Sequence, residues 1–130
     1  MITYLPLDVG LAFDGRRSDL IAFDWRKQTA DFVMPDDGES ALRVQFSGNT
    51  IVRLLDEMPS SIETDHRTWA GLIPGHFAYE VQGHPLLEEA SPTWKGVFTG
   101  MKQFAFITGW GCIDALTEGE ITFSVAPVRG

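Results

Sequence analysis

The chain has 130 residues, of which 44% are hydrophobic, 22% charged and 12% aromatic, a balance typical of a globular domain rather than of a disordered tail or a coiled coil. Eighteen carboxylates against ten lysines and arginines give a net charge of -8, which repels a phosphate backbone and argues against nucleic acid as a partner. We therefore predict a single globular domain over residues 1–130, and the aromatic content favours a mainly β fold.

The N-terminal apolar run, residues 2–13, has no basic residues before it and is interrupted by Asp8, so we expect no secretory signal. No apolar run approaches the roughly 20 residues that a bilayer requires, so we expect no membrane contact. Cys112 is the only cysteine, which excludes an internal disulfide and suits a reducing compartment. We expect a cytoplasmic protein.

The first half of the chain predicts several strands. Residues 20–25 and 30–34 flank a polar turn, a spacing typical of a hairpin with a four-residue loop, and a Pro-Asp-Asp-Gly turn follows at residues 35–38. In residues 42–47 apolar and polar side chains alternate, as in a strand with one buried face. Residues 47–49 resemble a hairpin turn that leads into residues 50–58. That segment fits a strand or a helical stripe, and we favour the strand.

The second half mixes loops, strands and one helix. Residues 57–75 have the composition of a surface loop, and they are the segment best suited to gate a site. Residues 77–81 and 103–108 are aromatic and β-branched runs bounded by glycines, which predicts two strands. A helix is expected to begin near His84 and to end before Pro92. Residues 111–117 fit a strand or a helix, whereas residues 121–125 alternate as a strand.

Together these elements predict a mainly β fold of six to eight short strands, with an α+β arrangement as the alternative. The antiparallel sheet is expected to close as a small barrel or to stack as a sandwich, with one or two short helices. The sequence does not decide between barrel and sandwich, nor does it give the strand order. An uncovered sheet edge would allow homo-oligomers to form.

Tests for catalytic and metal-binding chemistry are negative. His76, Glu80 and His84 have the even spacing of metal ligands on a helix, but an extended segment at about 3.3 Å per residue separates the two histidines by roughly 26 Å. The thirteen glycines form no phosphate-binding motif, and no nucleophile has an activating context. We therefore predict no metal site, no cofactor and no catalytic residue. Cys112 follows Trp110 in an apolar segment, so we expect a buried, slowly reacting thiol.

The first functional hypothesis is a small acidic binding protein without catalysis, which contacts and, for example, neutralises a basic protein partner. Residues 1–65 hold twelve carboxylates against six basic residues, and the early hairpin is the expected contact face. Trp69 lies in an irregular segment and is the expected interface anchor.

The alternative hypothesis is a small-molecule-binding or weakly catalytic β-barrel with an aromatic-lined pocket. Its ligand-binding residues would be Trp94, Trp110, His76 and Glu80, together with Tyr79. On an extended strand, however, Tyr79 points away from the side of His76 and Glu80, and this geometry weakens the hypothesis.

Overall fold

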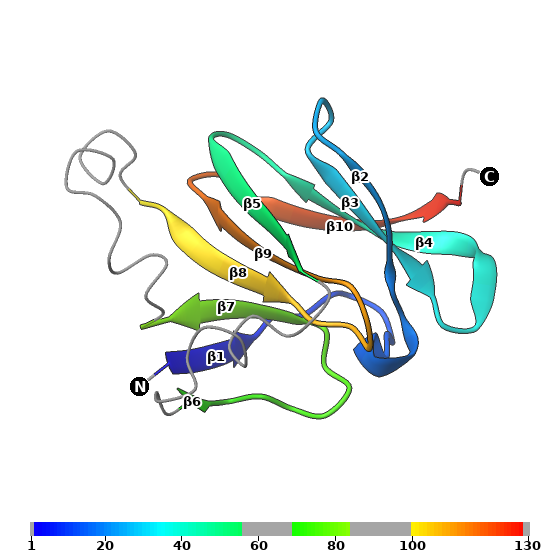
Figure 1. Cartoon of the computed structure of the whole chain (residues 1–130), viewed down its shortest axis with the longest axis horizontal. Helices are drawn as coiled ribbons and strands as arrows, with labels where there is room; N and C mark the ends of the chain where they lie inside the picture. The colour runs from blue at the N-terminus through cyan, green and yellow to red at the C-terminus, as the bar shows by residue number, and fades with distance from the viewer. Residues whose placement is uncertain (1, 56–68, 84–99, 129–130) are drawn as a thin grey trace.

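The computed structural model describes residues 2–55, 69–83 and 100–128, which form ten strands and one short 3-10 helix (Figure 1). The strands are β1 (Ile2–Pro6), β2 (Leu20–Asp24), β3 (Thr29–Met34), β4 (Asp37–Phe46), β5 (Thr50–Leu55), β6 (Trp69–Ala70), β7 (Ala78–Gln82), β8 (Lys102–Phe106), β9 (Cys112–Thr117) and β10 (Ile121–Pro127), and the 3-10 helix is η1 (Gly15–Arg17). The predicted mainly β class is confirmed. Within the described ranges, no helix has the length and hydrophobicity to cross a membrane.

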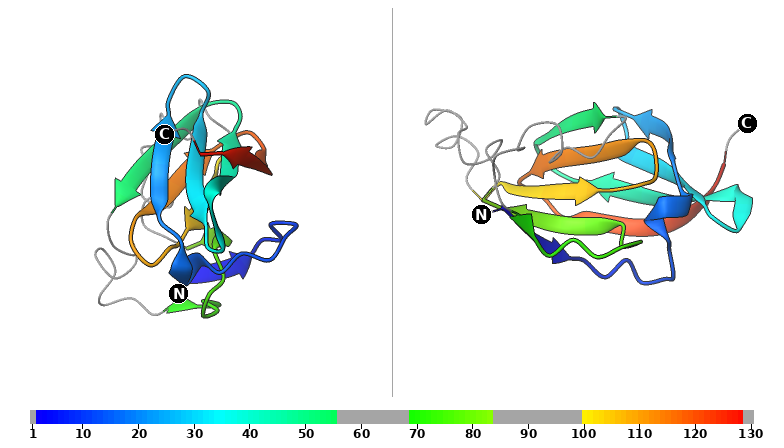
Figure 2. Two further views of the ribbon diagram at one scale, coloured as in Figure 1. Left: turned by 90° about the vertical axis from the view of Figure 1, so that its right-hand side faces the viewer. Right: turned by 60° about the horizontal axis from the view of Figure 1, so that its bottom comes forward.

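The strands build two sheets that pack face to face (Figure 2). The larger sheet has the order β5-β9-β8-β7-β1-β6, and the smaller has the order β10-β4-β3-β2. Neighbouring strands are antiparallel except for β1 and β6, which run parallel. Neither sheet of the described residues closes on itself. Of the two predicted arrangements, barrel and sandwich, the structure is a sandwich.

The main core lies between the sheets and consists largely of aromatic rings. Its buried members are Ala30, Phe32, Leu42, Val44, Phe46, Phe77, Ala78, Phe104, Phe106, Ile113 and Ala115. The ring of Phe106 has its centroid 5.5 to 6.4 Å from those of Phe32, Phe46, Phe77 and Phe123. These distances suit favourable aromatic contacts, and the cluster ties β8 to strands of the opposite sheet.

A tight corner connects the two sheets. β4 continues into β5 through residues 47–49, and β9 continues into β10 through residues 118–120. These two connecting segments pass from one sheet to the other side by side. Thr117 Oγ1 donates to the Ser47 carbonyl oxygen at 3.0 Å. Gly119 packs so closely against Ser47 that a Cβ atom would collide with that oxygen. The prediction that residues 47–49 form a hairpin turn is wrong, because β4 and β5 belong to different sheets.

Both segments whose structure the sequence left open are strands. Residues 50–55 form β5 and residues 112–117 form β9, whose six residues are all buried. A strand buried on both faces carries apolar residues at successive positions and shows no clear period of two. Chain positions 56–58 lie outside the described residues.

The early hairpin, the turn after it and the strands at residues 77–81 and 103–108 are confirmed with shifts of one or two residues at their ends. The expected number of strands is wrong, because β1 and the two-residue β6 bring the total to ten in the described part of the chain. Taken as one apolar run, residues 2–13 gave no separate prediction of the strand at their start, which ends at Pro6. The helix expected from His84 and most of the predicted loop at 57–75 lie outside the described residues.

Candidate functional site

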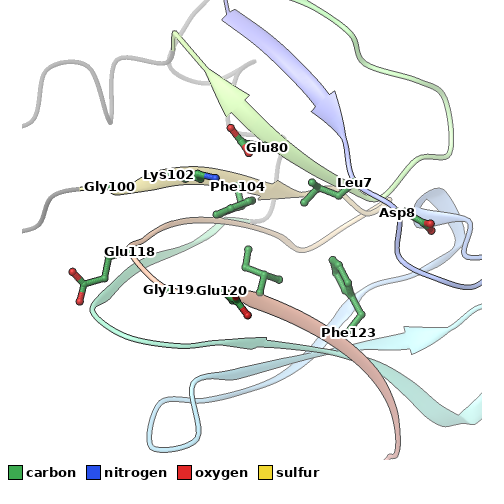
Figure 3. A pocket seen from close by; sticks show the side chains of 11 residues that line it. Leu7, Asp8, Glu80, Gly100, Lys102, Phe104, Glu118, Gly119, Glu120 and Phe123 are labelled. Carbon is green, nitrogen blue, oxygen red and sulfur yellow. The ribbon is translucent and has the colours of Figure 1, made fainter.

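A cleft of about 570 Å³ opens beside the corner, between β7 and β8 of the larger sheet and β10 of the smaller one (Figure 3). It is lined by Leu7, Asp8, Glu80, Gly100, Lys102, Phe104, Glu118, Gly119, Glu120, Ile121 and Phe123. The lining combines four carboxylates and one lysine with four large apolar side chains. We refer to this site as the corner cleft.

The topology explains why charged side chains lie on the inner face of the larger sheet at this point. Glu80 on β7 is the register partner of Phe104 on β8, and both belong to the alternation that points Phe106 into the core. Among the described strands, β10 is an edge strand of the smaller sheet, and the cover that these strands give the larger sheet ends there. Glu80 and Lys102 therefore occupy inner-face positions that reach solvent.

Two of the cleft carboxylates, Glu80 and Glu120, form weak hydrogen bonds or none with the described residues. Glu118 has a structural role, since its Oε1 accepts hydrogen bonds from the Asn49 backbone N–H at 3.2 Å and from Asn49 Nδ2 at 2.6 Å. Among the described residues, Glu80 accepts a single long hydrogen bond, of 3.4 Å from Gln82 Nε2. The Glu120 side chain makes no hydrogen bond with a described residue. No basic residue of the described ranges forms an ion pair with a carboxylate of the cleft.

The early hairpin, the contact face expected from the sequence, is closer to neutral. Asp31 accepts two hydrogen bonds from Arg43, at 2.8 and 2.9 Å. Asp24 accepts from the backbone N–H groups of Arg26 and Lys27, whose side chains add positive charge to the loop. Free negative charge is therefore more concentrated at the corner cleft than on the hairpin.

The structure separates the ligand-binding residues expected from the sequence. Glu80 lies in the corner cleft, whereas His76 lines a second pocket of about 280 Å³ together with Tyr79 and Thr108. Trp110 is 62% exposed and lines neither of these two hollows. These three predicted residues do not converge on one pocket.

The two other tryptophans singled out from the sequence are placed only in part. The backbone of Trp69 opens β6 and pairs with Ile2, but its side chain lies outside the description. Trp94 lies outside the described residues. The ligand and interface roles assigned to these residues stay predictions.

The expectation that His76 and Tyr79 point apart is wrong. Their ring centroids are 5.0 Å apart with an interplanar angle of 69°. β7 begins only at Ala78, and Gly75 adopts a positive φ of 82°, so His76 belongs to a turn and not to the strand whose alternation set the expectation. The turn brings its Nε2 to 3.0 Å from the Leu7 carbonyl oxygen.

The polar groups of the second pocket are already bonded to the backbone. The Tyr79 hydroxyl donates to the Ile73 carbonyl at 3.1 Å and accepts from the Ile73 N–H at 3.0 Å, and burial raises the pKa of Tyr79. Thr108 Oγ1 donates to the Gly111 carbonyl at 2.6 Å and accepts from the Trp110 N–H at 3.0 Å. These bonds fix the loops around the pocket and leave few groups to bind a ligand.

Across the described ranges, no three His, Cys, Asp or Glu side chains are grouped to hold a metal ion.

Cys112 begins β9 and is 1% exposed, as predicted. Burial raises the pKa of its thiol, and Sγ donates a long bond of 3.8 Å to the Thr108 carbonyl. A raised pKa keeps the thiol protonated at neutral pH, and the protonated form is a poor nucleophile.

We expect Cys112 in the native protein to react with a disulfide reagent at pH 7 only as fast as local opening exposes it, and to react fully in denaturant. The raised folded-state pKa also fixes the sign of a pH effect. The thiol's contribution to stability is complete below the ordinary thiol pKa and is lost as pH rises through the folded-state value. Absorbance of the released reagent anion measures the rate at which Cys112 reacts with the disulfide reagent. Fast labelling of the native chain at pH 7 would show that the thiol is not buried.

No protein-family model matches this chain, and no curated protein or solved structure is significantly similar to it.

Sequence reasoning found Glu80 but missed Lys102, Glu118 and Glu120. A Glu-Gly-Glu turn directly before an alternating strand was a usable local signal for the last two. The local sequence does not show that this turn lies across the cleft from Glu80 on β7, because that position depends on the strand order.

Proposed function

We propose that this protein is a binding domain without catalysis of its own, and that its corner cleft receives cationic side chains of a basic protein partner. The observation that carries the proposal is the pairing of Glu80 and Glu120, which form no ion pair with a basic residue of the described ranges, with the apolar floor formed by Phe104 and Phe123. Lysine and arginine have an apolar stem and a cationic head, and these two parts match the floor and the rim.

The overall charge supports the same partner. A net charge of -8 attracts a basic protein over distances near the Debye length and speeds its association. Neutralisation of a basic partner in the cytoplasm, where a single free thiol stays reduced, is the setting we propose. We do not propose the ligand-binding barrel, because the two sheets of the described residues do not close.

The double substitution Glu80→Gln with Glu120→Gln tests the proposal. The probe is a fluorescein-labelled peptide that alternates lysine and glycine, with its affinity measured by fluorescence anisotropy at low ionic strength. Each exposed charge contributes about 0.2–1 kcal/mol, so we expect the loss of two charges to raise the dissociation constant about two- to thirtyfold. Glu118 is left intact because it holds Asn49 at the corner.

The matched control is Asp36→Asn with Glu39→Gln, which removes an equal number of charges, one from the turn between β3 and β4 and one from the start of β4. We expect this variant to raise the dissociation constant less than about twofold. Equal weakening by the two variants would show that the peptide responds to total charge, and the corner cleft would lose its role.

A further inference from the structure

Among the described strands, the two sheets end in four edge strands, β5 and β6 on the larger sheet and β2 and β10 on the smaller. An edge strand presents a row of unpaired backbone N–H and C=O groups, which can pair with another extended chain. Proteins usually block such edges with short strands, bulges, prolines or charged side chains.

Three of the four edges carry such protection. β6 is only two residues long. The register of β2 shifts between Leu20 and Ala22, which interrupts its regular edge. β10 ends at Pro127, which has no N–H to donate.

β5 lacks these features. All six of its residues pair with β9 in unbroken register, it contains neither proline nor glycine, and among the described strands it has a partner on one side only. Its single charged residue, Arg53, is bound to the buried Asp114 on β9. Ile51 is 43% exposed and Leu54 is 53% exposed, and their odd spacing places them on opposite faces of the sheet.

We propose that β5 is the strand on which an extended segment of the basic partner adds to the larger sheet. The backbone groups of the edge specify an extended occupant, and Ile51 and Leu54 offer it apolar contacts on both faces. The partner's charge rests on the proposed function. A basic segment fits a chain of net charge -8 better than a second copy does, because two copies repel each other.

The position of β5 supports a basic occupant as well. The strand begins at the corner, where Glu118 binds Asn49, the residue before Thr50. A segment paired with β5 would therefore have one end near Glu118, whereas Glu80 on β7 is separated from β5 by β9 and β8. One partner could supply both the added strand and the cationic side chains in the cleft.

Two unlabelled peptides of equal charge and length test this inference on the full chain, one alternating lysine with valine and the other lysine with glycine. Amide hydrogen exchange of residues 50–55 is followed by NMR at low ionic strength. We expect the lysine–valine peptide at saturation to slow exchange of the outward amides of β5 about tenfold, because it adds a strand. The lysine–glycine peptide binds by charge and leaves these amides unchanged.

The variant Leu54→Lys and its control Val125→Lys sharpen the test. Each places a lysine at an apolar edge position that is more than half exposed, at 53% and 56%, and each changes the net charge equally. We expect Leu54→Lys to weaken binding of the lysine–valine peptide about tenfold, and Val125→Lys less than about threefold.

The outcomes separate the two proposals. If both peptides bind equally and β5 stays unprotected, the inference about β5 is overturned while the corner cleft keeps its role. If neither peptide binds, both proposals fail. If sedimentation shows a dimer, and the β5 amides are protected without peptide, the occupant is a second copy of the chain and the basic segment is excluded.

Discussion

Replacing Phe106 by alanine is expected to lower the free energy of unfolding by about 3–5 kcal/mol. The side chain is fully buried. Its ring centroid lies 5.5 Å from that of Phe77, directly before β7 of the larger sheet, and 5.8 Å from that of Phe46 on β4 of the smaller sheet. Alanine would leave a cavity in a layer that the surrounding backbone cannot fill without moving two sheets. Since domains of this size are stable by only about 5–15 kcal/mol, the change removes a large share of the total.

Urea unfolding, monitored by circular dichroism, measures this loss. The control is Trp110→Ala, which removes an even larger aromatic side chain from a position that is 62% exposed. We expect the control to change the free energy of unfolding by less than about 1 kcal/mol. A loss for Phe106→Ala no greater than that of the control would show that the aromatic cluster is not the core.

The second large effect is expected for Asp114→Ala, which removes one partner of the ion pair between β9 and β5. The Asp114 side chain is 1% exposed, and its Oδ1 accepts from Arg53 Nε at 2.8 Å, with a second bond from Nη2 to Oδ2. Breaking a buried pair by removing one partner costs about 3–5 kcal/mol. Arg53 is 24% exposed and can be partly rehydrated, so we expect about 3 kcal/mol.

Two further variants distinguish the loss of a buried pair from the loss of any carboxylate. Asp36→Ala breaks the ion pair between Asp36, which is 83% exposed, and Arg17, which is 56% exposed. We expect it to lower the free energy of unfolding by less than about 1 kcal/mol. The double variant Arg53→Met with Asp114→Leu removes both charges and should recover most of the stability. A double variant as unstable as Asp114→Ala would mean that loss of the pair itself, and not the charge that remains on Arg53, sets the cost.

The parts of the fold that the sequence predicts are those with one buried face. On β4, Leu42, Val44 and Phe46 alternate with exposed or half-buried residues, so the period of two is visible in the sequence. On β10 the same pattern predicts the strand, although Val125 near the edge is 56% exposed. On β9 both faces are buried, and the pattern disappears.

The candidate site was harder to predict because its residues come from three separate parts of the chain. Glu80 lies on β7, Lys102 on β8 and Glu120 in the turn before β10. Their proximity follows from the strand order and from the corner between the sheets, and neither is encoded in a local pattern. The carboxylates are visible in the sequence, but their arrangement around an apolar floor is a property of the fold.

An NMR titration of the full chain with the lysine–glycine peptide tests the central claim, that the corner cleft binds cationic side chains, most directly. Because this peptide does not add a strand, its amide shift changes report the charge-dependent contact alone. We predict that the largest changes occur at Glu80, at Lys102 and in residues 118–123, and that they vanish at high salt. Changes centred on the early hairpin at residues 21–29, or spread evenly over the surface, would contradict the claim.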